Sequence, residues 1–191
     1  MILNIMKKTV LAIFSVVLIV IMLPTIYVFA DGECGVNLSY SFDETSGILT
    51  ISGLGKMNNY PWGRGAPWDL HKEYIKVVII DEGVTSIGEG AFSDCKNLSS
   101  VAIPNSVLYI GELAFDCCYS LNSVIIPGSI DSIDTWAFYD CINLVSVTYL
   151  GSTEPNLGRD IFYGCKCSEV NVPNNYSGNT FCMLPIMRNL A

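Results

Sequence analysis

The sequence predicts an α/β solenoid, in which stacked coils place parallel strands on one face and short helical returns on the other. Two observations predict this fold. Apolar residues recur every 23 positions from Val78 to Val172, and within the repeat a strand-like alternation is followed by a turn and a short return segment. Solenoids present extended surfaces to partners, so the fold favours a binding protein over an enzyme.

Three columns of equivalent residues define the repeat. The valine column consists of Val78, Val101, Val124, Val147 and Val170. The phenylalanine column (Phe92, Phe115, Phe138 and Phe162) and the cysteine column (Cys95, Cys118, Cys141 and Cys165) are spaced by 23, 23 and 24 residues. A position kept by the repeat is expected to face the core, where cysteine packs as a small apolar residue. We therefore expect all three columns to be buried, with the phenylalanines stacked opposite the sheet.

One repeat shows how each coil is expected to form. Val101 and Ile103 alternate with Ala102, which is typical of a strand, and Pro104 ends the strand because proline has no N–H to donate. Residues 110–115 are then predicted to form a short helical or 3₁₀ return. By the period, strands are expected at 77–80, 100–103, 123–126, 146–149 and 169–172.

The first thirty residues have the pattern of a secretory signal peptide. Lys7 and Lys8 precede an apolar run over 10–29, and a polar segment follows Ala30. Because about 20 apolar residues also span a bilayer, an uncleaved signal anchor is the alternative. We predict cleavage after Ala30 and a protein that is secreted or held at the cell surface.

Three segments are expected after this signal. Residues 31–76 are predicted to be an N-terminal capping segment with a β-hairpin, 77–173 a solenoid of about four 23-residue repeats, and 174–191 a C-terminal cap or tail. Terminal units are expected to be atypical because they seal an open end of the stack. The last repeat departs from the pattern in this way, since Ile161 replaces the alanine that precedes the other phenylalanines.

Charge and cysteine content limit the classes of partner and chemistry. The formal net charge is −8, which argues against nucleic acid, and membrane contact is expected only if the signal segment stays uncleaved. Export permits disulfides. Among the cysteines outside the column, Cys167 and Cys182 are the best candidates for a bridge.

Catalytic and metal-binding patterns are weak. The one histidine, His71, lacks a recognisable nucleophile motif, and the carboxylate pairs Asp81–Glu82 and Asp131–Asp134 fall at turns, where carboxylates commonly bind the backbone. The cysteines lack zinc-ligand spacing, and neither a phosphate loop nor a calcium loop is present. We therefore expect a protein that is not an enzyme and that holds no cofactor or metal.

The repeat resembles the BspA-like leucine-rich repeat. The resemblance rests on Ile87-Gly88-Glu89-Gly90-Ala91-Phe92 with Cys95, Leu98 and Ile103-Pro104-Asn105-Ser106-Val107, and on an opening segment with Cys34-Gly35-Val36-Asn37-Leu38, Gly47–Gly53 and Pro67-Trp68. It covers about 34–182. It implies a right-handed leucine-rich-repeat solenoid and a surface or secreted role in adhesion, with extracellular-matrix or cell-surface proteins as partners.

The outward side chains of the strands are the first candidate site. Strand alternation predicts one central outward column, made of Ile79, Ala102, Ile125, Thr148 and Asn171. Exposed apolar residues on this face would form a patch suited to protein binding, with Ile125 at its centre. The alternative is a solvated sheet rich in serine and threonine.

The aromatic segment 60–68 is the second candidate. Trp62 and Trp68 offer flat apolar rings on which sugars can stack, which predicts glycan binding. The alternative is that these side chains cover the open end of the core. A structural surface scaffold without a soluble ligand is a third hypothesis for the whole protein.

Overall fold

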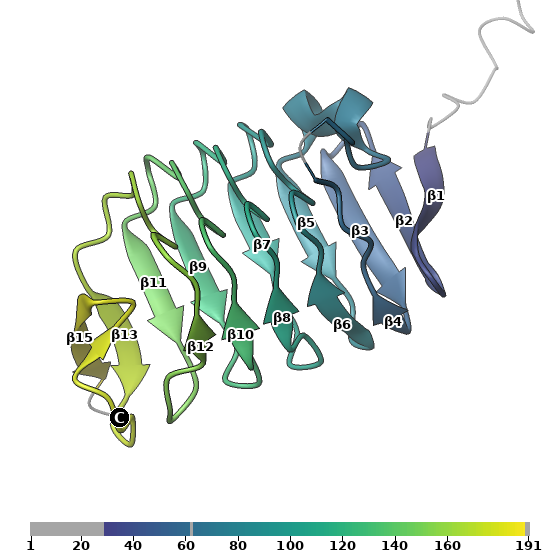
Figure 1. Cartoon of the computed structure of the whole chain (residues 1–191). Helices are drawn as coiled ribbons and strands as arrows, with labels where there is room; N and C mark the ends of the chain where they lie inside the picture. The colour runs from purple at the N-terminus through teal and green to yellow at the C-terminus, as the bar shows by residue number, and fades with distance from the viewer. Residues whose placement is uncertain (1–28, 62, 190–191) are drawn as a thin grey trace, which may run out of the picture.

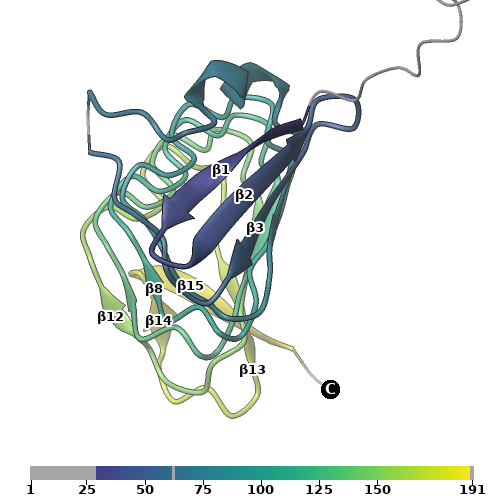
Figure 2. The ribbon, with the colours of Figure 1, turned by 90° about the vertical axis from the view of Figure 1, so that its right-hand side faces the viewer.

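The computed structural model describes residues 29–61 and 63–189. The predicted signal segment therefore lies outside the described residues except for Phe29 and Ala30, and so does Trp62. The described chain winds into coils stacked along one axis (Figure 1), and the coils superimpose when the stack is viewed from its N-terminal end (Figure 2). Their inward side chains form one hydrophobic core. No helix within the described ranges has the length and apolar character needed to span a bilayer.

The broad face of the solenoid carries the predicted strands. They are β5 (Val77–Ile80), β7 (Ser100–Ala102), β9 (Ser123–Ile126), β11 (Ser146–Tyr149) and β13 (Val170–Pro173). These bounds confirm all five predicted strands to within one residue. Equivalent residues pair in parallel, as Val124 does with Val147 and Val147 with Val170. β7 and β9 are neighbours along the stack but belong to different hydrogen-bonded sheets, so the face is divided there.

A narrow second sheet, which the sequence did not predict, lines another side of the coils. It contains β4 (Gly55–Lys56), β6 (Val84–Ile87), β8 (Tyr109–Ile110), β10 (Ser132–Ile133) and β12 (Asn156–Leu157). Ile110 and Ile133 are buried, and each pairs in parallel with its equivalent in the neighbouring coil. Ile110 is therefore extended rather than part of a helical return.

The returns are chains of turns and not helices, which corrects the prediction for 110–115. In the return at 90–95, alternate N–H groups bond within the coil and to the next coil. The amides of Ala91, Ser93 and Cys95 donate to carbonyls three residues back, whereas those of Gly90, Phe92 and Asp94 donate to Glu112, Ala114 and Asp116. In a 3₁₀ helix every amide would donate to the carbonyl three residues back. The alternate amides that now donate to the next coil would then be unable to form these inter-coil bonds.

Two positions in each return require a left-handed backbone. One holds Gly90, Leu113, Trp136 and Asp160, and the other holds Asp94, Cys117, Asp140 and Gly164, all with φ between 50° and 78°. Bulky residues rarely adopt this conformation. Inter-coil hydrogen bonds such as that from Trp136 N–H to the Arg159 carbonyl (3.0 Å) hold it in place.

The predicted phenylalanine column forms, and Trp68 extends it by one ring beyond its first member, Phe92. Trp68, Phe92, Phe115, Phe138 and Phe162 stack in sequence with ring centroids 5.0–5.5 Å apart. The small Ala91, Ala114 and Ala137 beside them are also buried, which lets successive returns approach closely. Stacked aromatic pairs contribute roughly 0.5–1.5 kcal/mol beyond the area that they bury.

Both ends of the stack are sealed by extra strands. At the N-terminus, β2 (Leu38–Asp43) and β3 (Ile48–Gly53) form the predicted hairpin, and β1 (Phe29–Gly35) adds a further antiparallel strand to β2. β3 also pairs in parallel with β5 and so opens the stack one strand before the repeat begins. At the C-terminus, β15 (Leu184–Asn189) pairs in parallel with β13 and antiparallel with β14 (Thr180–Phe181).

The cysteine column is part of the core, as predicted, although Cys165 in the last coil is only partly buried. The thiols of Cys118, Cys141 and Cys165 donate to the carbonyl of the phenylalanine in the preceding coil, at 3.1–3.3 Å. All eight cysteines are free. The predicted Cys167–Cys182 bridge is therefore wrong for this structure, in which both thiols are free.

The phenylalanine column predicts a large loss of stability on truncation. Phe115 is fully buried between two stacked rings, so Phe115→Ala should reduce the free energy of unfolding by about 3–5 kcal/mol. Phe162→Ala is the matched control and should cost less, because Phe162 has a stacking partner on one side only and is partly exposed. Denaturant melts measure both, and a wild-type melt for Phe115→Ala would contradict the core assignment.

Thiol reactivity provides a second test. Burial raises the pKa of Cys34 and Cys117 to about 11 and that of Cys95 to about 12, so these thiols stay protonated at pH 8. Because the thiolate is the reactive form, alkylation of the native protein should be slow, and denaturant should expose eight reactive thiols. A mass shift of six labels after denaturation without reductant would show a disulfide and contradict the structure.

Candidate binding surfaces

The outward column of the broad sheet faces solvent as the alternation predicted. Burial alternates along β9, where Val124 and Ile126 are buried while Ile125 is 58% exposed. Ala102 is exposed as well, and Ile79, Thr148 and Asn171 are partly exposed.

Strand pairing extends this column beyond the repeat. Thr50 of β3 pairs with Ile79, and Met187 of β15 pairs with Asn171. The sheet-face column thus comprises Thr50, Ile79, Ala102, Ile125, Thr148, Asn171 and Met187. None of these side chains carries a charge, in a chain whose formal net charge is −8.

The second candidate site is wrong as far as Trp68 is concerned. Trp68 is 0% exposed, its ring stacks on Phe92 at 5.5 Å, and its Nε1 donates to the Ala91 carbonyl at 2.9 Å. A sugar ring cannot reach it because both the face and the polar edge of the indole are occupied. Trp68 instead covers the open end of the phenylalanine column, which is the alternative that the sequence left open.

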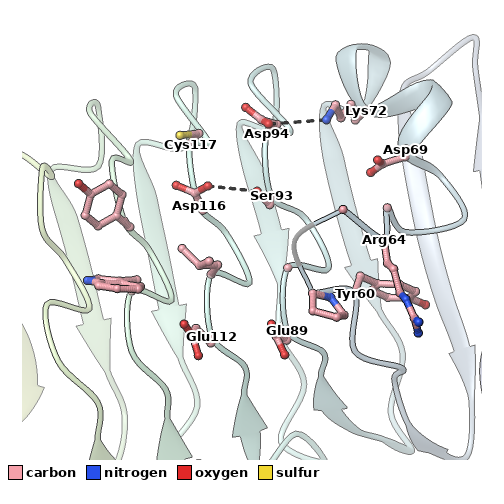
Figure 3. Close-up of a pocket in the computed structure, with 17 residues that line it drawn as sticks. Tyr60, Arg64, Asp69, Lys72, Glu89, Ser93, Asp94, Glu112, Asp116 and Cys117 are labelled. Atoms are coloured by element: carbon pink, nitrogen blue, oxygen red, sulfur yellow. Dashed lines mark hydrogen bonds and ion pairs between the residues drawn. The ribbon is translucent and has the colours of Figure 1, made fainter.

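A groove of about 830 Å³ lies on the return side of the coils (Figure 3). Its N-terminal wall is formed by residues 60–61 and 63–65, and its floor crosses the left-handed positions of successive returns at Gly90 and Leu113. No side chain larger than hydrogen fits at Gly90, because a Cβ there would lie 2.4 Å from the Tyr60 carbonyl oxygen. Tyr60 and the first return are therefore in direct contact.

Aromatic side chains form the far end of the groove. Trp136 occupies the left-handed position after Leu113 and is 39% exposed. Its ring meets the Tyr139 ring edge-on at 6.2 Å, and Tyr139 stacks in parallel on Tyr163 at 5.2 Å. These rings lie on the outer surface, separate from the buried phenylalanine column.

Carboxylates line the middle of the groove. Figure 3 shows Glu89 and Glu112 on neighbouring coils, with Asp116 beside Ser93. The Ser93 hydroxyl donates to the Asp116 carboxylate at 3.1 Å. Partial burial raises the pKa of Asp116, and the hydrogen bond from Ser93 opposes this shift.

The groove is lined by more carboxylates than basic groups. The basic residues of its lining are Arg64 and Lys72, and Lys72 is already paired. Lys72 lies 3.7 Å from Asp94, which also pairs with Lys96 at 3.9 Å. Within the described ranges, none of Glu89, Glu112 and Asp116 has a basic group within ion-pair distance. The groove therefore has a negative centre and an aromatic end.

The residues weighed for catalysis have structural contacts. His71 Nδ1 lies 3.2 Å from Glu44, and the His71 ring packs against Phe42. The Asp134 carboxylate accepts a hydrogen bond from the Tyr109 hydroxyl at 2.7 Å, and Glu82 accepts one from the Asn105 amide. No metal-ligating cluster of histidine, cysteine or carboxylate side chains occurs in the part of the chain that the structure describes.

The groove was missed at the sequence level although the repeat contains a signal for it. The equivalent positions 90, 113, 136 and 160 hold Gly, Leu, Trp and Asp, and positions 93, 116, 139 and 163 hold Ser, Asp, Tyr and Tyr. Such variation within a strict repeat indicates positions outside the core. Predicting a groove there also required knowing that the backbone of Tyr60 lies against the return at 90–95.

The family of the chain follows from this repeat. The family model described as the BspA type leucine rich repeat region matches residues 70–182 in six copies, which is more than half of the sequence. The chain therefore belongs to the BspA-type leucine-rich-repeat family, and its solenoid fold class is the predicted one. The sequence matches no functionally curated protein.

Solved bacterial structures resemble the chain. A leucine rich repeat protein of T. pallidum is 18% identical with a TM-score of 0.53, over 81% of this chain and 80% of that one. One from Eubacterium ventriosum is 20% identical with a TM-score of 0.48, over 78% of this chain but only 39% of that protein. A leucine rich cell surface protein from Faecalibacterium prausnitzii is 16% identical with a TM-score of 0.37, over 76% and 55% of the two chains. The T. pallidum protein shares the fold.

The position of Trp68 predicts the effect of removing its hydrogen bond. Trp68→Phe keeps an aromatic ring on Phe92 but leaves the buried Ala91 carbonyl without its indole donor, which should cost about 1–3 kcal/mol of unfolding free energy. Denaturant melts measure the change. An unchanged melting curve would show that the indole edge is not buried as described.

Proposed function

We propose that the protein is exported and binds other proteins at or outside the cell surface through its broad sheet face, without catalysing a reaction. The signal-peptide pattern of residues 1–30 supports export, and membership of the BspA-type family supports a surface role. Extracellular-matrix or cell-surface proteins are the expected class of partner. Stacked coils supply a long rigid face that suits such contacts.

The observation that carries this proposal is the exposed, uncharged sheet-face column with Ile125 at its centre. Ile125 is the most exposed isoleucine of the described chain at 58%; Thr148 pairs with it on β11, and Ala102 holds the equivalent position on β7 of the preceding coil. Depletion of charge around exposed apolar residues is typical of the centre of a protein interface. Val145 and Leu150, at the two ends of β11, add exposed apolar surface close by.

The glycan alternative through Trp62 and Trp68 is not retained as a second function. Trp68 is part of the core, and Trp62 lies outside the described residues. The scaffold alternative has no specific observation in its favour.

A substitution at the centre of the column tests the proposal. Ile125→Lys places a charge in the middle of the expected interface, so binding to extracellular-matrix or cell-surface proteins found in a screen with the wild-type chain should fall at least about tenfold. The free energy of unfolding should change little, because the Ile125 side chain is mostly in solvent. Surface plasmon resonance measures the affinity and a thermal melt checks the fold.

The matched control is Ile142→Lys. Ile142 is 43% exposed and lies in a corner, where the equivalent positions of two other coils already hold Lys96 and Lys166. It should bind like the wild type. Equal loss in both variants, or full binding by a folded Ile125→Lys protein, would show that the partner does not bind the sheet face.

A further inference from the structure

Trp136 has no role in the core that would account for its size. The equivalent positions in other coils hold Gly90, Leu113 and Asp160, so the fold does not require an aromatic ring there. A tryptophan with φ of 57° is also unfavourable for its own backbone. Its ring is nonetheless 39% exposed at the end of a groove, beside Tyr139. An exposed indole in such a place is available to a ligand.

Charge complementarity defines which ligand suits the groove. Glu89 and Glu112 occupy equivalent positions in adjacent coils, about 4.8 Å apart in backbone spacing, and Asp116 lies on the same return as Glu112. Within the described ranges none of these three carboxylates forms an ion pair, whereas Lys72 pairs with Asp94. A cationic group in the groove would be attracted by these carboxylates, and the exposed Trp136 ring at its end offers a cation–π contact.

We infer that this groove binds an extended lysine- or arginine-rich segment of a partner polypeptide. The alkyl stem of a lysine or arginine packs on Leu113 and Trp136 while its charged end meets Glu112 and Asp116. The distance along the stack from the Glu89 coil to the Trp136 coil is two coil steps, about 10 Å, which an extended chain spans with about three residues. This site is on the return side and is independent of the sheet-face proposal.

A neutral glycan is a poorer match to the same residues. Sugar rings stack on an open aromatic face, but the Tyr139 and Tyr163 rings lie against each other at an interplanar angle of 10°. Sugar hydroxyls also leave the negative charge of the carboxylates uncompensated, whereas a cation compensates it.

Calorimetric titration of the purified chain with a hexalysine peptide at low ionic strength tests the inference. Trp136→Leu copies the residue that the neighbouring coil carries at Leu113, so it keeps the fold while removing the aromatic face. It should weaken binding by about three- to tenfold. The double variant Glu89→Gln/Glu112→Gln should weaken it by about tenfold. Binding should also weaken as salt is added.

The matched control removes two charges elsewhere. Glu33 and Glu169 are exposed and lie outside the groove, so Glu33→Gln/Glu169→Gln should change the affinity for hexalysine by less than about twofold. Equal weakening by the two double variants would overturn the inference, because binding would then follow total charge. Wild-type affinity in Trp136→Leu would also overturn it, as would Trp136-dependent binding of cellohexaose without binding of hexalysine. A thermal melt of each variant confirms that it is folded.

Discussion

The fold depends on hydrogen bonding between coils, which fixes the separation of neighbouring coils near 4.8 Å. Parallel strands supply these bonds on two sides of each coil, and alternate amides of the returns supply them on the third. Once the coils are held at this distance, identical side chains must lie directly on one another. Phenylalanine rings satisfy the constraint because parallel stacking of the rings, at 5.0–5.5 Å between centroids, nearly matches the coil spacing.

The same constraint explains the backbone of the returns. To direct every second amide to the next coil, the chain must turn back at two positions per return, and it does so with positive φ. Residues as unlike as Gly90, Leu113 and Trp136 occupy one of these positions, because the inter-coil bonds outweigh the local preference. The outward side chain at this position can therefore vary from coil to coil without a change in the backbone.

The ends of the stack show how a repeating core is closed. Trp68 covers the first phenylalanine and satisfies a buried carbonyl with its indole nitrogen, which no phenylalanine can do. At the other end, Tyr149 is buried against Tyr176 and Phe181, and the hydroxyls of both tyrosines find carbonyl acceptors. Aromatic residues with a polar group suit these positions because one side faces the core and the other meets exposed backbone.

The sequence by itself determined the coil length, the strands of the broad sheet, the three core columns and the outward column around Ile125, because each follows from a period of 23 residues and an alternation of two. Within the core columns only Val101, Phe162 and Cys165 are partly rather than fully buried. Only the tertiary structure decided that the returns are turns, that Trp68 is core and that Trp136, Glu112 and Asp116 line one groove. These features arise from contacts between coils and from the packing of Tyr60 on the return at 90–95. A repeat pattern specifies which residues are equivalent, but it does not specify where a segment outside the repeat will pack.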